Sequence, residues 1–155
     1  MIVFIDTGVL GLLSSPNDKS EAQKCQQWLY YLLSKGMYVI SSDLCDYEVR
    51  RSLILNKMRQ SKYQSLDNLD RLEDLIDFLP ITKPVMKCAA QLWATSRRQG
   101  MPTTDEKNID VDVIIAAQCQ LFQQENLGQN LVIATTNVKH LSRFAQAQRW
   151  QDVRL

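Results

Sequence analysis

The stretch Met-Ile-Val-Phe-Ile-Asp-Thr-Gly, residues 1–8, opens this 155-residue chain with an apolar run that ends at Asp6. The run predicts a buried strand, Thr7 and Gly8 a turn, and the apolar residues 9–13 the start of a helix. In open α/β sheets the ligand crevice lies beyond the carboxyl ends of the strands. Asp6 therefore stands where ligands usually bind, although capping of the next helix by Asp6 or Thr7 explains the same pattern.

The rest of the chain repeats this alternation of strand and helix. Further strands are predicted over residues 37–40, 79–82, 131–135 and 150–155, and helices over residues 20–34, 43–60, 66–78, 85–98, 112–124 and 138–143, with a loop at 100–104. Strands that alternate with helices of this length predict right-handed crossovers and a mostly parallel sheet covered on both faces. The chain shows no repeat or linker, so we expect a single α/β domain over residues 1–155.

Composition and charge exclude several classes of protein. The chain has 18 Lys and Arg against 17 Asp and Glu, so its net charge of +1 gives no overall attraction to nucleic acid or membrane. No apolar run reaches the roughly 20 residues of a membrane span, and the N-terminal run has no basic residue before it, unlike an export signal. We therefore expect a cytoplasmic protein without a membrane partner.

The cysteines give no sign of a metal or disulfide framework. None of the four forms a C-x-x-C pair, and they lie far apart in the sequence. Buried, reduced thiols are the expected state of all four. They are Cys25, Cys45, Cys88 and Cys119.

A second acid, Glu48, lies in the first turns of the helix that follows the second predicted strand. Its expected position is again over the carboxyl end of the sheet. A surface ion pair with Arg51, three residues later, is an equally open interpretation of Glu48.

Two further acids, Asp110 and Asp112, precede the unusually apolar run 113–117. An acid in the first turn of a buried helix is stabilised by the positive end of the helix dipole. Residues two apart lie on nearly opposite sides of a helix, so Asp110 and Asp112 cannot both face one site if both lie within the helix. We therefore expect Asp110 to be the N-cap and Asp112 the functional carboxylate.

The late strand 131–135 ends in the polar residues Thr135, Thr136 and Asn137. Their hydroxyl and amide groups offer oxygen ligands and hydrogen-bond donors without charge. A cap for the short helix that follows explains the same residues equally well.

Three acids gathered at one edge of a sheet, with no matching lysine, indicate a divalent cation. Close carboxylates repel one another, which raises at least one pKa unless a cation is present. Mg²⁺ and Mn²⁺ prefer oxygen ligands and activate water for attack on phosphodiesters. His140 is the sole histidine, so no Ser-His-Asp or Cys-His arrangement competes, and we expect His140 at the surface or the substrate rim.

Taken in order, the segments 1–10, 48–51, 112–117 and 135–141 resemble PIN domains, particularly the VapC-like toxin ribonucleases. The resemblance spans essentially the whole chain. It implies an α/β/α sandwich with four or five parallel strands and a nuclease site that binds Mg²⁺ or Mn²⁺. By position, Asp6, Glu48 and Asp112 match the first three acids of that family. Asn137 stands where many members have a fourth Asp, a departure that puts a second metal ion in question, and Thr136 is expected to share its role.

The resemblance implies a ribonuclease that hydrolyses RNA phosphodiester bonds as the toxin of a type II toxin–antitoxin pair. A small antitoxin and a second copy of the chain are the implied protein partners. The departure at Asn137 favours an alternative, a catalytically degenerate module that binds nucleic acid or protein. A phospho-aspartyl phosphatase is a third possibility, but Gly8 stands where its second Asp would be.

Several side chains near these motifs are candidates for contact with RNA or protein. Thr7, Asp110 and Arg51 are secondary or substrate-binding candidates, and basic residues form a possible phosphate-binding rim that is equally an ordinary solvated surface. Apolar residues on the second and third helices are either core or partner contacts. The rim consists of Arg50, Arg51, Lys57, Arg59, Lys62, Lys139, His140 and Arg143, and the apolar set of Tyr30, Tyr31, Leu53, Ile54 and Leu55.

Overall fold

The computed structural model describes residues 1–16, 20–60, 64–100 and 106–155. In these residues a five-stranded sheet has the order β3-β2-β1-β4-β5, and every neighbouring pair of strands is parallel. The order reverses beside β1, which is where ligand crevices form in such sheets. The strands are β1 (Ile2–Ile5), β2 (Tyr38–Ser42), β3 (Asp77–Leu79), β4 (Leu131–Thr135) and β5 (Ala147–Arg149).

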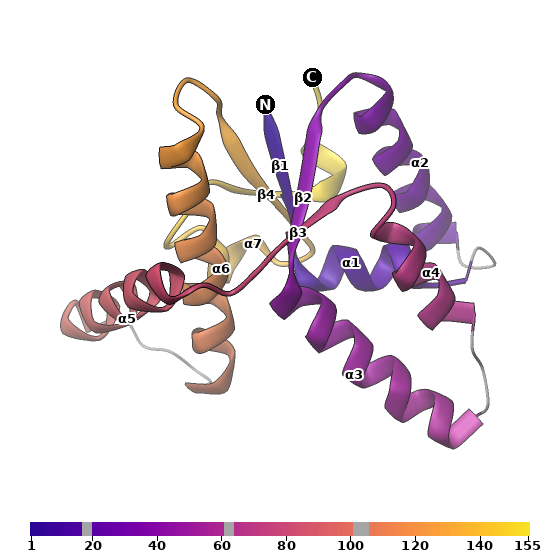
Figure 1. The fold of residues 1–155 in the computed structure, drawn as a ribbon, viewed down its shortest axis with the longest axis horizontal. Coiled ribbons are helices and arrows are strands. Elements are labelled where there is room, and N and C mark those ends of the chain that lie inside the picture. Colours follow the sequence, from indigo (N-terminus) through magenta and orange to yellow (C-terminus); the bar gives the residue numbers. More distant parts are fainter. Residues whose placement is uncertain (17–19, 61–63, 101–105) are drawn as a thin grey trace.

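Helices cover both faces of the sheet, which confirms the predicted α/β sandwich. Figure 1 shows α1 to α4 on one side of the strands and α5 to α7 on the other. This division follows from right-handed crossovers. From β1 to β3 the chain moves along the sheet in one direction, and from β3 to β5 it moves in the opposite direction, so the connecting helices lie on opposite faces. The helices are α1 (Thr7–Ser14), α2 (Ser20–Ser34), α3 (Asp43–Gln60), α4 (Gln64–Leu72), α5 (Lys83–Arg98), α6 (Glu106–Glu125), α7 (Val138–Leu141) and the 3₁₀ turn η1 (Trp150–Asp152).

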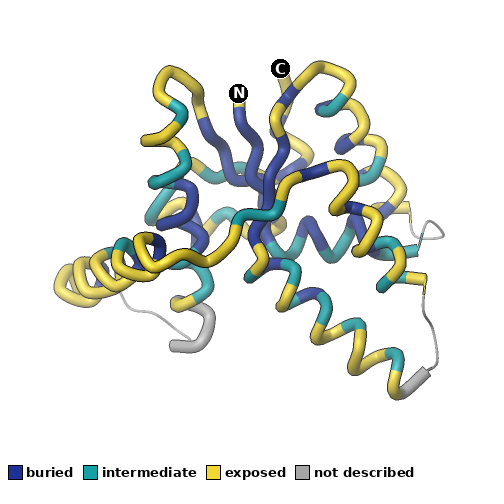
Figure 2. The backbone as a smooth tube through the Cα atoms, viewed as in Figure 1, coloured by how far each residue is buried: buried dark blue, intermediate teal, exposed yellow. Residues whose placement is uncertain are grey.

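The core consists mainly of the central strands and the helix faces that cover them. All residues of β1 and β4 are buried, as Figure 2 shows by the dark strands at the centre. Continuous apolar runs are typical of parallel strands covered on both faces. Trp28 of α2 packs edge-on against Trp150, and its Nε1 donates to the carbonyl of Val153 at 3.0 Å. These contacts hold the C-terminal segment against α2.

The second strand extends to Ser42, two residues beyond its predicted end. Ser41 and Ser42 are fully buried, and hydrogen bonds offset the cost of burying their hydroxyls. Ser41 Oγ donates to the carbonyl of Ile5 at 2.7 Å, and Ser42 Oγ accepts from the backbone N–H of Leu44 at 3.0 Å. A polar pair in a strand thus continues the sheet up to the start of α3.

The predicted helix over residues 66–78 is wrong at its end, and so is the predicted strand over 79–82. The helix α4 ends at Leu72, and residues 77–79 pair with β2 as an edge strand. Acids recur at three- and four-residue spacing from Asp67 to Asp77, as on an exposed helix face, but the last of them lies in β3. Thr82 instead caps α5, since its Oγ1 accepts from the N–H of Val85 at 3.4 Å.

Three other predicted elements also have different bounds in the structure. The helix α6 already includes Glu106, so Asp110 lies inside it rather than at its N-cap. The last strand is formed by residues 147–149, because Trp150 turns into the core in η1. The short helix after β4 ends at Leu141, and most of the predicted loop at 100–104 lies outside the described residues.

The cysteines match the sequence prediction except at Cys88. All four are free, three of them are buried and Cys88 is partly buried. Burial raises the pKa of Cys25 and of Cys45 to about 12. None of the described helices combines the length and apolar character needed to cross a bilayer.

Candidate active site

Asp6 both caps α1 and faces a cavity at the carboxyl end of β1. Its Oδ1 accepts from the N–H of Val9 at 3.1 Å, and its Oδ2 accepts a hydrogen bond from the hydroxyl of Thr135. The side chain is almost fully buried, and burial raises the pKa of Asp6 although these hydrogen bonds lower it. Asp6 therefore caps α1 and also lines the cavity, as each of the two sequence interpretations expects.

Thr135 connects the ends of the two central strands. Ile5 of β1 is paired with Ala134 of β4, which brings the next residue of β4 beside Asp6. The Thr135 hydroxyl donates to Asp6 and accepts from the backbone N–H of Asn137 at 3.0 Å. The sequence named Thr135 only as one of three polar residues that could offer oxygen ligands, and its contact with Asp6 was not predicted. The parallel pairing of two strands that both end in polar residues could have identified this contact.

Glu48 approaches the cavity from the second turn of α3. Thr7 Oγ1 donates to Glu48 Oε1 at 2.7 Å, and Arg51 Nη2 lies 3.6 Å from Glu48 Oε2. The guanidinium of Arg51 also lies over the ring of Tyr47, 5.2 Å from its centroid. Glu48 thus combines the ion pair expected of a surface residue with a position on the cavity.

Asp112 reaches the cavity from α6. The pKa of Asp112 is raised to about 6. Burial is the largest cause, the charges of Asp6 and Glu48 also raise the pKa, and those of His140 and Arg143 lower it. Ionisation of this carboxyl at neutral pH is therefore opposed by both burial and its acidic neighbours.

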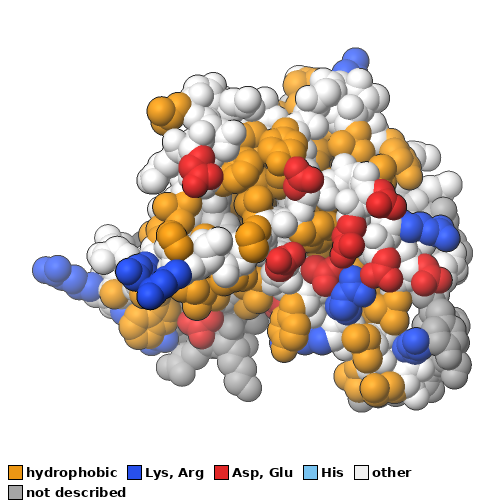
Figure 3. Space-filling view, viewed as in Figure 1, with side chains coloured by type: hydrophobic (Ala, Val, Ile, Leu, Met, Phe, Trp, Pro, Cys, Tyr) orange, Lys and Arg blue, Asp and Glu red, His pale blue; other side chains and the backbone are white. Residues whose placement is uncertain are grey.

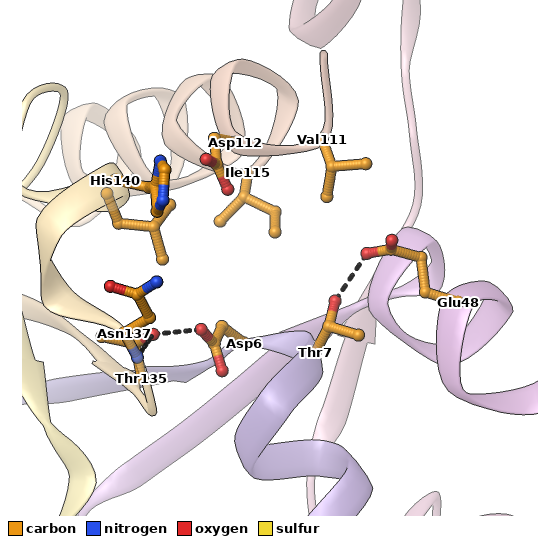
Figure 4. Close-up of a pocket in the computed structure, with 10 residues that line it drawn as sticks. Asp6, Thr7, Glu48, Val111, Asp112, Ile115, Thr135, Asn137 and His140 are labelled. Carbon is orange, nitrogen blue, oxygen red and sulfur yellow. Dashed lines mark hydrogen bonds between the residues drawn. The ribbon is translucent and has the colours of Figure 1, made fainter. Parts of the chain in front are cut away.

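The three acids line one cavity of about 230 Å³. Figure 4 shows Asp6 and Asp112 facing into it, with Glu48 on the opposite side turned toward Thr7. Among the residues that the structure describes, no Lys or Arg lines the cavity. Among the described residues, however, no three acids, histidines or cysteines lie close enough together to bind one ion directly. The lining residues are Asp6, Thr7, Glu48, Val111, Asp112, Ile115, Thr135, Asn137, His140 and Leu141.

The other predicted site residues divide into two groups. Asn137 lines the cavity and caps α7, its Oδ1 accepting from the N–H of Lys139 at 3.3 Å, and His140 lines the cavity from α7. Thr136 is exposed and does not line it. Asp110 lies in a separate groove between α5 and α6, since residues two apart on a helix face different ways.

Thr136 closely approaches Gly8 in the first turn of α1. A Cβ at position 8 would lie 2.3 Å from Thr136 Oγ1 and 3.2 Å from its Cγ2. We expect Gly8→Ala to lower the free energy of unfolding by about 1–2 kcal/mol, the usual cost of overpacking. Urea denaturation would measure this change in the free energy of unfolding. A double variant, Gly8→Ala with Thr136→Ala, should recover most of the lost stability. Equal destabilisation in the single and double variants would show that this contact is not the cause.

The fold is shared with chains of several solved structures. The VapBC-1 structure from nontypeable Haemophilus influenzae matches at a TM-score of 0.65 and 21% identity, over 98% of this chain and 100% of that one. The FitAcB structure from Neisseria gonorrhoeae matches at a TM-score of 0.67 and 18% identity, over 97% of this chain and 99% of that one. The structure of VapBC2 from Rickettsia felis, bound to a DNA fragment from its promoter, matches at a TM-score of 0.67 and 14% identity. The match covers 97% of this chain and 99% of that one.

No family model and no curated protein matches the sequence. The similarity to the solved structures nevertheless covers nearly every residue of both chains. The chain therefore has the PIN-like α/β/α fold that its motifs predict, the fold of chains in the VapBC and FitAB structures.

Proposed function

We propose that the chain is a metal-dependent ribonuclease that hydrolyses RNA phosphodiester bonds. The observation that carries the proposal is the convergence of Asp6, Glu48 and Asp112, from three separate segments, on one cavity. Within the described part of the chain, His140 is the one basic residue that lines this cavity. Burial is the main cause of the raised pKa values of Asp6 and Asp112, and the negative charge of neighbouring acids adds to it. Perturbed carboxyls in a cleft are typical of functional sites, and a bound cation would relieve the repulsion.

The donor groups of the cavity fit Mg²⁺ or Mn²⁺. Carboxylate, hydroxyl and amide oxygens are present, whereas the described residues offer no thiol there. Mg²⁺ needs only one or two carboxylates, with water and substrate as its other ligands, so acids too dispersed for three direct bonds are compatible with it. Asp6 and Asp112 would hold the ion, and Glu48 would hold it or orient a water molecule. When bound, the ion would supply an activated water and neutralise charge on the scissile phosphate.

Neighbouring side chains position these carboxylates. The Thr135 hydroxyl and the Val9 N–H fix both oxygens of Asp6, and Thr7 fixes one oxygen of Glu48. The charge of His140 lowers the pKa of Asp112 and so favours its ionised form. Thr7, Thr135 and Asn137 are in our proposal positioning residues of the site.

The basic residues around the cavity would hold RNA phosphates by salt-dependent attraction. Arg51, Lys139 and Arg143 are exposed near the acids and suit this role. Arg50 does not, because it forms ion pairs of 2.8 Å with Asp46 and with Asp70. The side chain of Arg59 and all of Lys62 lie outside the described residues, and we assign them no part.

We further infer that the ribonuclease acts as a toxin that pairs with a small antitoxin and forms a homodimer. The shared fold with VapBC and FitAB chains supports this inference. Several apolar residues that the sequence left as core or contact are exposed and so available to partners: Tyr30, Tyr31, Ile54 and Leu55. Growth arrest on expression, relieved by co-expression of the product of a neighbouring gene, would test the toxin role.

The nuclease proposal is tested by incubating the purified chain with a labelled single-stranded RNA. We expect cleavage with Mg²⁺ or Mn²⁺, none with EDTA, and recovery when excess ion is added back. RNA binding without cleavage under every ion condition would instead support the degenerate binding module that Asn137 suggests.

A further inference from the structure

We propose that the outer face of α5 binds the sugar–phosphate backbone of the RNA substrate, at nucleotides beyond the bond that is cleaved. This inference rests on the proposed ribonuclease function, because it assigns a second contact with the same substrate. It is carried by the charge and the position of α5 and not by the acids of the cavity.

The charge of α5 is of one sign only. The helix has four basic residues and no acid among its 16 residues, so it contributes +4 to a chain whose net charge is +1. The other three basic residues follow Lys83 by four, 14 and 15 positions. At 3.6 residues per turn this spacing places all four within about 100° on one side of the helix. We call these four residues the α5 stripe: Lys83, Lys87, Arg97 and Arg98.

The α5 stripe faces solvent along its whole length. All four of its residues are exposed, and the opposite side of the helix packs on α6 through Val85 and Ala89. Between the two ends of the stripe lie Ala90, Gln91 and Ala94, which are small or uncharged and also exposed. Figure 3 shows Lys and Arg side chains over α5 at the left of the molecule. An extended anion can therefore approach the helix over about 22 Å.

Three of the four cations have no acid partner in the part of the chain that the structure describes. Lys83, Lys87 and Arg98 form no ion pair there. The guanidinium of Arg97 lies over the ring of Trp93, 4.9 Å from its centroid. Trp93 is 40% exposed, so it offers an unpaired base an aromatic surface beside a cation. Cations interleaved with an exposed aromatic ring suit a single strand of RNA.

The stability of the helix explains only half of the α5 stripe. Arg97 and Arg98 lie in the last turn, where the negative end of the helix dipole favours cations. Lys83, however, follows the N-cap Thr82 directly, at the end where the dipole disfavours a cation. Lys87 lies four residues later, a spacing at which like charges repel each other. The two lysines therefore oppose the helix that carries them, as expected of residues that serve an anionic ligand.

The α5 stripe begins at the edge of the sheet where the cavity lies. All five strands are parallel, and Asp6 and Thr135 line the cavity from the carboxyl ends of β1 and β4. The strand β3 ends at Leu79 of the same edge, and α5 starts four residues later at Lys83. From there α5 projects away from the strands (Figure 1). RNA that extends beyond the cavity can therefore continue along the stripe.

Fluorescence anisotropy with a labelled single-stranded RNA, measured in EDTA, tests the contact without cleavage. We expect Lys83→Gln with Lys87→Gln to raise the dissociation constant about tenfold or more. The slope of log affinity against log salt should fall by about 1.4, which corresponds to two lost phosphate contacts at about 0.7 each. The melting temperature of the variant should not decrease, because two unfavourable charges are removed from the helix. The ratio of the two dissociation constants should approach one as the RNA is shortened.

The matched control is Lys24→Gln with Lys35→Gln, which removes the same charge from exposed positions at α2, on the other side of the sheet from α5. This control should bind RNA as the wild type does. Arg98→Gln repeats the test at the far end of the α5 stripe and should lower the salt slope by about 0.7.

Three results would overturn the proposal: no RNA binding by the wild type in EDTA, an equal loss of affinity in the stripe and control variants, or salt slopes that neither stripe variant changes. Cleavage by the wild type with Mn²⁺ is measured separately. Stripe-dependent binding without cleavage rejects only the nuclease proposal. Cleavage without stripe-dependent binding rejects only the contact proposed for α5.

Discussion

Asp112→Asn is expected to lower the rate of RNA cleavage by on the order of 10³-fold and, at the same time, to make the metal-free protein more stable. Loss of one group that stabilises charge in an active site typically costs 10²–10³-fold in rate. Stability should rise because Asn removes a charge that burial and the nearby acids disfavour. Because Asp112 is partly exposed, solvent screening reduces the expected gain in free energy of unfolding to about 1–2 kcal/mol, or a few degrees in melting temperature.

The opposite signs of these two effects make the result diagnostic. Asp6→Asn and Glu48→Gln should also abolish cleavage, but Asp6→Asn should not stabilise as much, because Asp6 caps α1 and accepts from Thr135. Glu125→Gln, an exposed acid on the same helix as Asp112, is the matched control and should leave rate and stability unchanged. Full cleavage by Asp112→Asn, or a loss of rate that follows a loss of folding, would contradict the assigned role.

The stability of the metal-free protein is expected to fall as the pH rises from about 4 to about 7. The pKa of Asp112 is raised from 3.8 to about 6 in the folded chain, so between these values the folded state binds more protons than the unfolded state. The contribution of Asp112 to stability is therefore fully present below pH 3.8 and is lost as the pH rises through about 6. The raised pKa of Asp6 acts in the same direction.

A divalent ion should reverse this trend, because it binds the ionised carboxylates. Melting temperatures measured in EDTA and in Mn²⁺ at pH 5 and pH 7.5 would show it: the stabilisation by Mn²⁺ should be large at pH 7.5 and small at pH 5. Asp112→Asn should flatten the pH dependence measured in EDTA. An Mn²⁺ effect that is equal at both pH values would mean that the ion does not compete with protons at these acids.

The parts of the fold that the sequence predicted well are those with a strong local signal. The strands 2–5 and 131–135 are unbroken apolar runs, and the helix 20–34 has one apolar face, so each was placed within a residue. The edge strands were misplaced because their pairing with β2 and β4 is a tertiary contact. Their short sequences carry no alternation that distinguishes them from a helix end or a tail.

The same distinction applies to the site. Asp6 and Glu48 were located because acids that follow strands meet at one edge of a parallel sheet. The contact of Thr135 with Asp6 was not predicted because it depends on the register between β1 and β4. Asp110 was wrongly placed at a helix N-cap because α6 begins four residues earlier, at Glu106, where no apolar run marks its start in the sequence.

Calorimetric titration of the metal-free chain with Mn²⁺ at pH 7.5 tests most directly whether these scattered carboxylates form one cation site. We expect saturable binding to the wild-type chain, at least tenfold weaker binding to Asp6→Asn and to Asp112→Asn, and unchanged binding to Glu125→Gln. Binding that is absent from the wild type, or equally strong in all four proteins, would contradict the account.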